Sequence, residues 1–225
     1  MKNNSLVSTA AVLLLALGNC GLLSAGSVRF LLLDEATASR ELGFQDAKGI
    51  KKLENLSSGE CSAPQDFDKG EGALQLVAMD RESPDGKPVA TTVVVPDGMK
   101  APLVLISPDE KEAAGVKALA VEDSKAGFPW GSILFVNTTG QALVIRHGED
   151  ETELAATPAC QVVKPGGEAR NISVQVAKQD DPGKTIYSAI WEHDPNVRKL
   201  ALVVADADGA NLQLKVIPED RRLEE

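Results

Sequence analysis

The sequence predicts an all-β protein, an Ig-like or related antiparallel β-sandwich, arranged as two similar β-sandwich halves in tandem after an N-terminal signal segment. Short apolar or alternating segments recur along the chain, separated by turns rich in Pro, Gly, Asp and Asn. Only Asp109–Ala114 has helical composition, and one turn of helix is too short to change the fold class. The same order of segments occurs twice, although one large sandwich with strands of similar length is the alternative.

The first 26 residues predict a signal peptide. Lys2 supplies a short positive region, Val7–Leu17 is apolar, and Ser24-Ala25-Gly26 offers small residues for cleavage. The apolar run is shorter than the ~20 residues that a membrane-spanning helix needs. We therefore expect an exported protein in the periplasm or cell envelope, or secreted, and we exclude residues 1–26 from the fold.

Cys20 gives the N-terminus a second interpretation. Leu17-Gly18-Asn19-Cys20 resembles a bacterial lipobox, whose cysteine is lipidated, but Asn19 stands where that pattern has Gly, Ala or Ser. Cleavage as an ordinary signal peptide, a lipid anchor at Cys20 and an uncleaved anchor therefore all stay open. Contact with the membrane is expected only through a lipid at Cys20.

The first half is predicted over residues 27–122. It opens with the run Val28–Leu33, which is apolar except for Arg29 and is typical of a strand buried on both faces. Pro96-Asp97-Gly98 predicts a hairpin between the runs on either side of it, because Pro fixes φ and Gly tolerates a positive φ. Further strands are expected at 41–45, 73–79, 89–95, 103–106 and 116–121, with 49–56 ambiguous between a strand and a helical turn.

The second half is predicted over residues 132–218, after a connector at 123–131 and before a loose charged tail at 219–225. Phe128 and Trp130 in the connector are expected to be buried between the halves. Asn137–Gly140 predicts a second hairpin. Strands are expected at 133–136, 142–146, 160–163, 172–176, 186–191, 200–204 and 212–216.

The two halves share a similar sequence of landmarks. Val28 and Ile133 each open an apolar strand. Near the end of each half, an Asp-containing turn is followed six residues later by a Leu-rich strand, from Asp97 to Leu103 and from Asp194 to Leu200. Residue identity between the halves is low, so this similarity is one of pattern.

The charge of the chain excludes one class of partner. The net charge is −10 and the pI is about 4.8, with no basic run longer than two residues. Nucleic-acid binding needs clustered Lys and Arg, so no nucleic-acid partner is expected. The expected partner is an unidentified protein or an envelope polymer.

Cys61 and Cys160 would remain after cleavage of the signal peptide. An isolated pair in an oxidising compartment is a candidate disulfide, and it would link the two halves. Two unpaired thiols are the alternative, because about a hundred residues separate the cysteines and the sequence does not give their distance.

No cofactor or metal site is expected. The only histidines, His147 and His193, are far apart, and the chain has no Cys-x-x-Cys motif. A copper site built from both histidines and Cys160 lacks the usual close Cys–His spacing. Asp206-Ala207-Asp208-Gly209 has the start of a calcium loop but lacks the ligands that should follow.

No catalytic residue is predicted. The chain has no Gly-x-Ser-x-Gly nucleophile motif. The alternative to a non-catalytic binding module is an exported hydrolase that uses paired carboxylates. That hypothesis requires Glu149, Glu192, His193 or Asp194 to gather in one cleft.

Two peptides stand out in a chain with only 4% aromatic residues. Phe128-Pro129-Trp130-Gly131 and Trp191-Glu192-His193-Asp194-Pro195 place Trp130, Trp191 and His193 as candidates for a binding surface. The alternative is packing, with Trp130 at the junction of the halves and Trp191 in a core.

Overall fold

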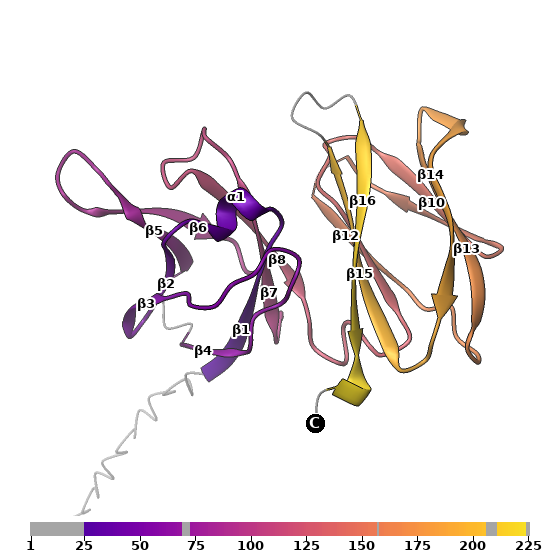
Figure 1. The fold of residues 1–225 in the computed structure, drawn as a ribbon, viewed down its shortest axis with the longest axis horizontal. Coiled ribbons are helices and arrows are strands. Elements are labelled where there is room, and N and C mark those ends of the chain that lie inside the picture. The colour runs from indigo at the N-terminus through magenta and orange to yellow at the C-terminus, as the bar shows by residue number, and fades with distance from the viewer. Residues whose placement is uncertain (1–24, 69–72, 157, 206–210, 224–225) are drawn as a thin grey trace, which may run out of the picture.

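A computed structural model describes residues 25–68, 73–156, 158–205 and 211–223 (Figure 1). The prediction of an all-β protein with two β-sandwich halves is confirmed. The described residues form sixteen strands in four sheets of four strands each. One short α-helix and a final 3₁₀ turn, η1 (Arg221–Leu223), complete the described chain.

The first half contains eight strands in two sheets. The sheets have the strand orders β4-β1-β7-β8 and β3-β2-β5-β6. Between β1 and β2 lies the one-turn helix α1 (Glu35–Ala38), capped by Asp34, whose side chain accepts a hydrogen bond from the Thr37 amide. The strands are β1 (Ala25–Leu32), β2 (Leu42–Asp46), β3 (Gly49–Lys52), β4 (Gln65–Asp68), β5 (Leu74–Glu82), β6 (Pro88–Val93), β7 (Pro102–Pro108) and β8 (Val116–Glu122).

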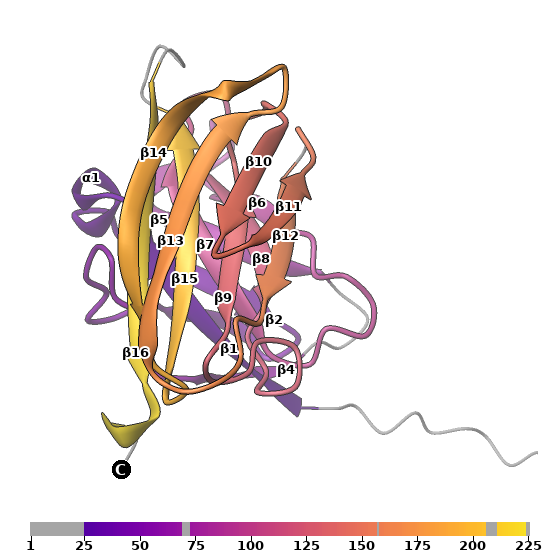
Figure 2. The ribbon, with the colours of Figure 1, turned by 90° about the vertical axis from the view of Figure 1, so that its right-hand side faces the viewer.

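The second half also contains eight strands in two sheets, with the orders β12-β9-β15-β16 and β11-β10-β13-β14. Figure 2, viewed from the side of this half, shows its outer sheet face on. The strands are β9 (Ile133–Asn137), β10 (Leu143–His147), β11 (Asp150–Leu154), β12 (Ala159–Val163), β13 (Arg170–Lys178), β14 (Asp181–His193), β15 (Val197–Ala205) and β16 (Leu212–Asp220).

The two halves have the same topology. Each strand of the first half corresponds to the strand numbered eight higher in the second half, in both sheets. Each half has one parallel pair, β1 with β7 and β9 with β15, and its other strand pairs are antiparallel. The repeated landmarks in the sequence mark equivalent strands, since Leu103 lies in β7 and Leu200 in β15.

Three apolar cores lie between successive sheets, so the molecule has four layers. The first core fills the first half, the second core fills the second half, and the central core lies between the two inner sheets. Strand β1 sends Phe30 into the first core and Leu31 into the central core. Strand β9 likewise sends Phe135 into the second core and Leu134 into the central core. Alternate residues of a strand face opposite sides, so both faces of these strands are buried.

This layering explains the apolar runs that open each half. A strand with water on one face alternates apolar and polar residues, whereas a strand between two cores is apolar at most positions. The expectation for Val28–Leu33 is therefore confirmed for its five apolar residues, which are all buried, whereas Arg29 is half-buried. All four residues of 133–136 are buried.

Both predicted hairpins are wrong. The turn at Pro96-Asp97-Gly98 joins β6 to β7, and the turn after Asn137 joins β9 to β10, but in each case the two strands belong to different sheets. Turn chemistry reverses the chain direction without deciding which sheet the next strand enters.

Other local expectations also failed. Residues 109–114 form turns, and the one described α-helix is instead at Glu35–Ala38. Strands β4 and β11 were not expected, because Gln65–Asp68 and Asp150–Leu154 are largely polar. Residues 219–223 are not a loose tail, since Glu219 and Asp220 extend β16.

Two expectations at the N-terminus concern residues that lie outside the described part of the chain, namely most of the predicted signal peptide and Cys20. No described helix is long and apolar enough to span a membrane.

Candidate functional site

Arg198 of β15 holds the junction of the two halves together. Its side chain is 4% exposed. Nε donates a hydrogen bond of 2.8 Å to Glu219, and Nη1 donates to the carbonyls of Asp123 (3.0 Å) and Phe128 (3.1 Å). Nη2 lies 2.6 Å from the Glu219 carboxylate and 2.8 Å from Oδ1 of Asp123, although the latter contact lacks hydrogen-bond alignment. Arg198 thereby fixes the connector against β15 and β16.

Arg29 of β1 completes this network from the first half. Its Nη1 lies 2.8 Å from Asp123, its Nη2 pairs with Glu219, and its Nε donates to the Ser62 carbonyl at 3.1 Å. Burial alone would raise the pKa of Glu219, but Arg29 and Arg198 outweigh it and hold that pKa below its usual range. Two arginines and two carboxylates thus form a charge-balanced network, which we call the junction network.

Trp130 lies in the connector, next to the junction network. The Arg198 guanidinium lies 5.0 Å from the centroid of its ring and 4.7 Å from that of Phe128. Phe128 is 2% exposed in the central core, as expected, whereas Trp130 is only half-buried. Trp130 lines a hollow of about 580 Å³ between the two halves, here called the junction hollow. Its other lining residues are Arg29, Cys61, Ser62, Ala63, Pro64, Pro218, Glu219, Asp220 and Leu223.

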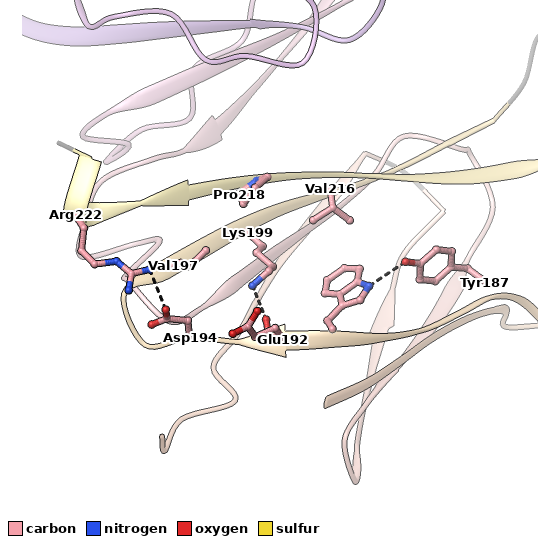
Figure 3. A pocket seen from close by; sticks show the side chains of 9 residues that line it. Tyr187, Glu192, Asp194, Val197, Lys199, Val216, Pro218 and Arg222 are labelled. Atoms are coloured by element: carbon pink, nitrogen blue, oxygen red, sulfur yellow. Dashed lines mark hydrogen bonds and ion pairs between the residues drawn. The ribbon is translucent and has the colours of Figure 1, made fainter. Parts of the chain in front are cut away.

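A second hollow, of about 550 Å³, lies at the end of the second half between β14 and the strands β15 and β16 (Figure 3). We call it the edge hollow, because β14 and β16 are edge strands of their sheets. Val216 and Pro218 approach it from β16, and Tyr187 from β14. The other lining residues are Trp191, Glu192, Asp194, Val197, Lys199 and Arg222.

Charged side chains bridge the edge hollow. Lys199 donates a hydrogen bond of 2.7 Å from Nζ to the Glu192 carbonyl, and burial lowers the pKa of Lys199. Arg222 pairs with Asp194 at 3.0 Å and also with Asp220. Hydrogen bonds from Asn196, together with Arg222, lower the pKa of Asp194. Most of the charges around this hollow are therefore already engaged by the protein itself.

The exposed aromatic surface gathers at these two hollows. The chain has eight aromatic residues, and all lie in the described part. Six are buried, and the two half-buried ones are Trp130 and Tyr187, one in each hollow. Pro218 lines both hollows. The end of β16 is therefore a shared wall, with one half-exposed aromatic ring on each side.

Trp191 is a core residue. It is 8% exposed, stacks on Phe135 with a centroid distance of 6.1 Å, and donates a hydrogen bond of 2.9 Å from Nε1 to the Tyr187 hydroxyl. Its ring is therefore not a free stacking surface, although it contributes to the lining of the edge hollow.

His193 is also buried, at 4% exposure, and it lines neither hollow. Its Nε2 has no hydrogen-bond partner among the described residues. Burial and the nearby Arg170 lower the pKa of His193, which favours the neutral ring. Of the three residues suggested as a binding surface, Trp130 offers the most accessible side chain.

The carboxylates of the hydrolase hypothesis do not meet in one cleft. Glu192 and Asp194 line the edge hollow, but Glu149 lines a separate hollow beside His147. His147 is 8% exposed, and its Nε2 lies 3.2 Å from the Thr152 hydroxyl.

Cys61 and Cys160 are separate thiols, so the expected disulfide is not formed. The topology of the sheet keeps the two cysteines apart. Cys61 lies beside Glu219 of β16, whereas Cys160 is in β12, at the opposite edge of the same sheet. Burial raises the pKa of the Cys61 thiol to about 12.

Within the described residues, no group of three or more His, Cys, Asp or Glu side chains is placed to hold a metal ion. The segment Asp206-Ala207-Asp208-Gly209, which resembles the start of a calcium loop, lies outside the described part of the chain.

Comparisons with known proteins leave the role of the chain open. No protein-family model matches it, and no curated protein matches it. A solved structure from Bacteroides uniformis ATCC 8492, described as a "putative cell adhesion protein", aligns with 88% of this chain and 97% of its own. The identity is 11% and the TM-score 0.25, so this similarity assigns neither fold nor function.

Proposed function

We propose that the protein is an exported, non-catalytic binding module of the bacterial envelope. Its two halves would correspond to residues 27–122 and 132–218, joined by the connector 123–131. Support for export comes from the sequence of the first 26 residues, with either a cleaved signal peptide or a lipid at Cys20. The partner would be a protein or a polymer of the envelope.

One observation carries the binding role. Six of the eight aromatic residues are buried, and the remaining two lie in adjoining hollows. Ligand sites in proteins are concave, contain aromatic surface and have a few fixed polar groups, in volumes of about 300–1,000 Å³. Both hollows meet that description, and the junction network holds their shared wall in place.

The hydrolase alternative receives less support. A glycosidase needs one carboxylic acid with a raised pKa, facing a second carboxylate across the cleft. In the edge hollow, the pKa of Asp194 is instead lowered by Asn196 and Arg222. Among the described residues that line this hollow, Glu192 does not face a carboxyl group with a raised pKa.

Sedimentation with envelope fractions of the producing cell tests the proposal. The purified protein is compared with the double variant Trp130→Ala/Tyr187→Ala and with the control Ile190→Ala, whose side chain is 66% exposed and lines neither hollow. We expect the protein and the control to sediment with the envelope and the double variant to stay in solution. Equal sedimentation of all three, or of none, would refute binding through this face.

A further inference from the structure

We propose that the junction hollow and the edge hollow together bind one extended, uncharged carbohydrate chain, with Trp130 and Tyr187 as its two stacking surfaces. The inference rests on the proposed binding function and names the ligand class of that same face. Three observations carry it: the support of the two rings, the pairing of the surrounding charges, and the occupied edge of β14.

Both rings are held in place before any ligand arrives. The buried Arg198 guanidinium lies 5.0 Å from the centroid of the Trp130 ring. Tyr187 accepts the hydrogen bond from Trp191, and the two rings meet edge to face with centroids 6.3 Å apart. Rings that are already ordered lose little conformational entropy on binding, which favours affinity from a small contact area. The exposed Lys125 lies 6.0 Å from the Trp130 centroid, and a ligand would displace this flexible side chain.

The charges around the hollows favour an uncharged ligand. Arg29 and Glu219 are paired with each other, and Arg222 is paired with Asp194 and Asp220. A charged ligand would have to compete with these ion pairs. A ligand rich in hydroxyl groups would not, because paired groups still have unused hydrogen-bonding capacity. Nη1 and Nη2 of Arg29 each make one hydrogen bond and retain a second N–H.

An extended peptide fits less well than a carbohydrate. Peptides commonly bind to β proteins by adding a strand to a free sheet edge through main-chain hydrogen bonds. At the edge hollow, the Glu192 carbonyl of the edge strand β14 already accepts a hydrogen bond from Lys199. The hollows present side chains and ring surface instead, which is the chemistry that recognises sugar rings.

The two hollows are arranged so that one carbohydrate chain can occupy both. Pro218 belongs to both, so a ligand that crosses the end of β16 would reach Trp130 on one side and Tyr187 on the other. A short oligosaccharide that reached only one ring would lose half of the stacking. We therefore expect affinity to rise with the length of the oligosaccharide until both hollows are filled.

The experiment measures binding of the purified protein to insoluble cellulose, chitin and β-1,3-glucan, which are uncharged, and to oligosaccharides of increasing length from whichever polymer binds. The variants are Trp130→Ala, Tyr187→Ala, the double variant Trp130→Ala/Tyr187→Ala and Trp130→Phe, with Ile190→Ala as the matched control. Loss of one stacked ring should weaken binding about ten-fold, and loss of both about a hundred-fold, if one chain spans both hollows. Trp130→Phe should bind better than Trp130→Ala, and Ile190→Ala should bind normally. Tyr187→Ala should lower the unfolding midpoint, because it removes the acceptor of the Trp191 indole N–H. Binding of every variant is therefore measured well below its own midpoint.

Two results would overturn the inference. One is that none of the three polymers binds, and the other is that both alanine variants bind as well as the parent. The envelope sedimentation separates this failure from failure of the proposed function. If sedimentation depends on Trp130 and Tyr187 and is abolished by protease treatment of the envelope, the face binds a protein, and only the carbohydrate inference is wrong.

Discussion

The two halves share one topology but join the edges of their sheets differently. In the first half, the edge strands β6 and β8 are close enough for the short Thr91 side chain to donate a hydrogen bond of 3.0 Å to the Val116 carbonyl. In the second half, the edge hollow opens between β14 and the strands β15 and β16, and the long side chains of Lys199 and Arg222 bridge it. A repeated topology therefore does not carry a repeated site.

The cores show the same difference. Around the second core, every partly buried apolar residue comes from β14 or β16, whereas those around the first core come from loops as well as strands. The second core is thus least covered along one edge. Those residues are Ile186, Tyr187, Ala189, Leu212, Leu214 and Val216.

The largest expected effect comes from breaking the junction between the halves. Arg198→Met removes the cation at the centre of the junction network and leaves Asp123 and Glu219 without it. Removal of one partner from a buried ion pair costs about 3–5 kcal/mol. We expect urea unfolding to show a loss of that size in the free energy of unfolding.

Arg222→Met is the matched control for Arg198→Met, because its side chain is 56% exposed and its ion pairs are screened by solvent. It should cost less than about 1 kcal/mol. Equal losses for the two variants would show that the junction network does not hold the halves together.

The next effect is a dependence on pH. The pKa of Glu219 is lowered in the folded protein, so its contribution to stability is complete above its unfolded pKa of about 4.3 and is lost as the pH falls through its folded pKa. Glu219→Gln should cost about 2–3 kcal/mol at pH 7, because it removes a charged acceptor from two arginines. Unfolding curves of the two proteins should converge as the pH falls from 5 to 3. A constant difference across this range would contradict the assigned role.

A smaller effect compares the hydrogen-bonded edge between β6 and β8 with the edge hollow of the second half. Thr91→Val removes the hydrogen bond between β6 and β8 and should cost about 1 kcal/mol. Lys199→Met should cost less or be neutral, because burial lowers the pKa of Lys199 and its charged form is therefore destabilised by folding. Thermal unfolding of both variants decides the order, and a larger loss for Lys199→Met would contradict the comparison.

The last prediction is that reduction does not change the stability of the protein. Because Cys61 and Cys160 are unbridged, a reductant should leave the free energy of unfolding unchanged. A bridge between the halves would contribute about 2–4 kcal/mol, and reduction would remove it. Mass analysis of the unfolded protein after thiol labelling gives the same information directly, since both cysteines should be labelled without reduction.

Much of the fold could be predicted from local sequence. The apolar runs at Val28–Leu33, which only Arg29 interrupts, and at 133–136 indicated buried strands, and the repeated landmarks indicated two similar halves. Local sequence could not show whether the turns at Pro96-Asp97-Gly98 and after Asn137 form hairpins. A turn motif does not say whether the next strand pairs with the last one or crosses to the facing sheet.

Less of the site could be predicted, because its parts are far apart in the sequence. Arg198 meets residues that precede it by 75 and 70 positions, Asp123 and Phe128, and no local pattern signals such contacts. Tyr187 was missed, although it is the only tyrosine and lies four residues before Trp191. Trp130 was recognised as unusual, and its packing against the junction was expected, but not its place in a hollow.

Hydrogen exchange measured by mass spectrometry, with and without a bound envelope fraction, tests most directly whether the site lies at the junction hollow and the edge hollow. Binding should slow exchange in 61–63, 128–131, 187–194 and 216–223, which surround the two hollows, and leave the edge strands of the first half that correspond to β14 and β16, 88–93 and 116–122, unchanged. Protection of the β6 and β8 edges as strong as that of the segments around the hollows would contradict the assignment of function to the junction hollow and the edge hollow.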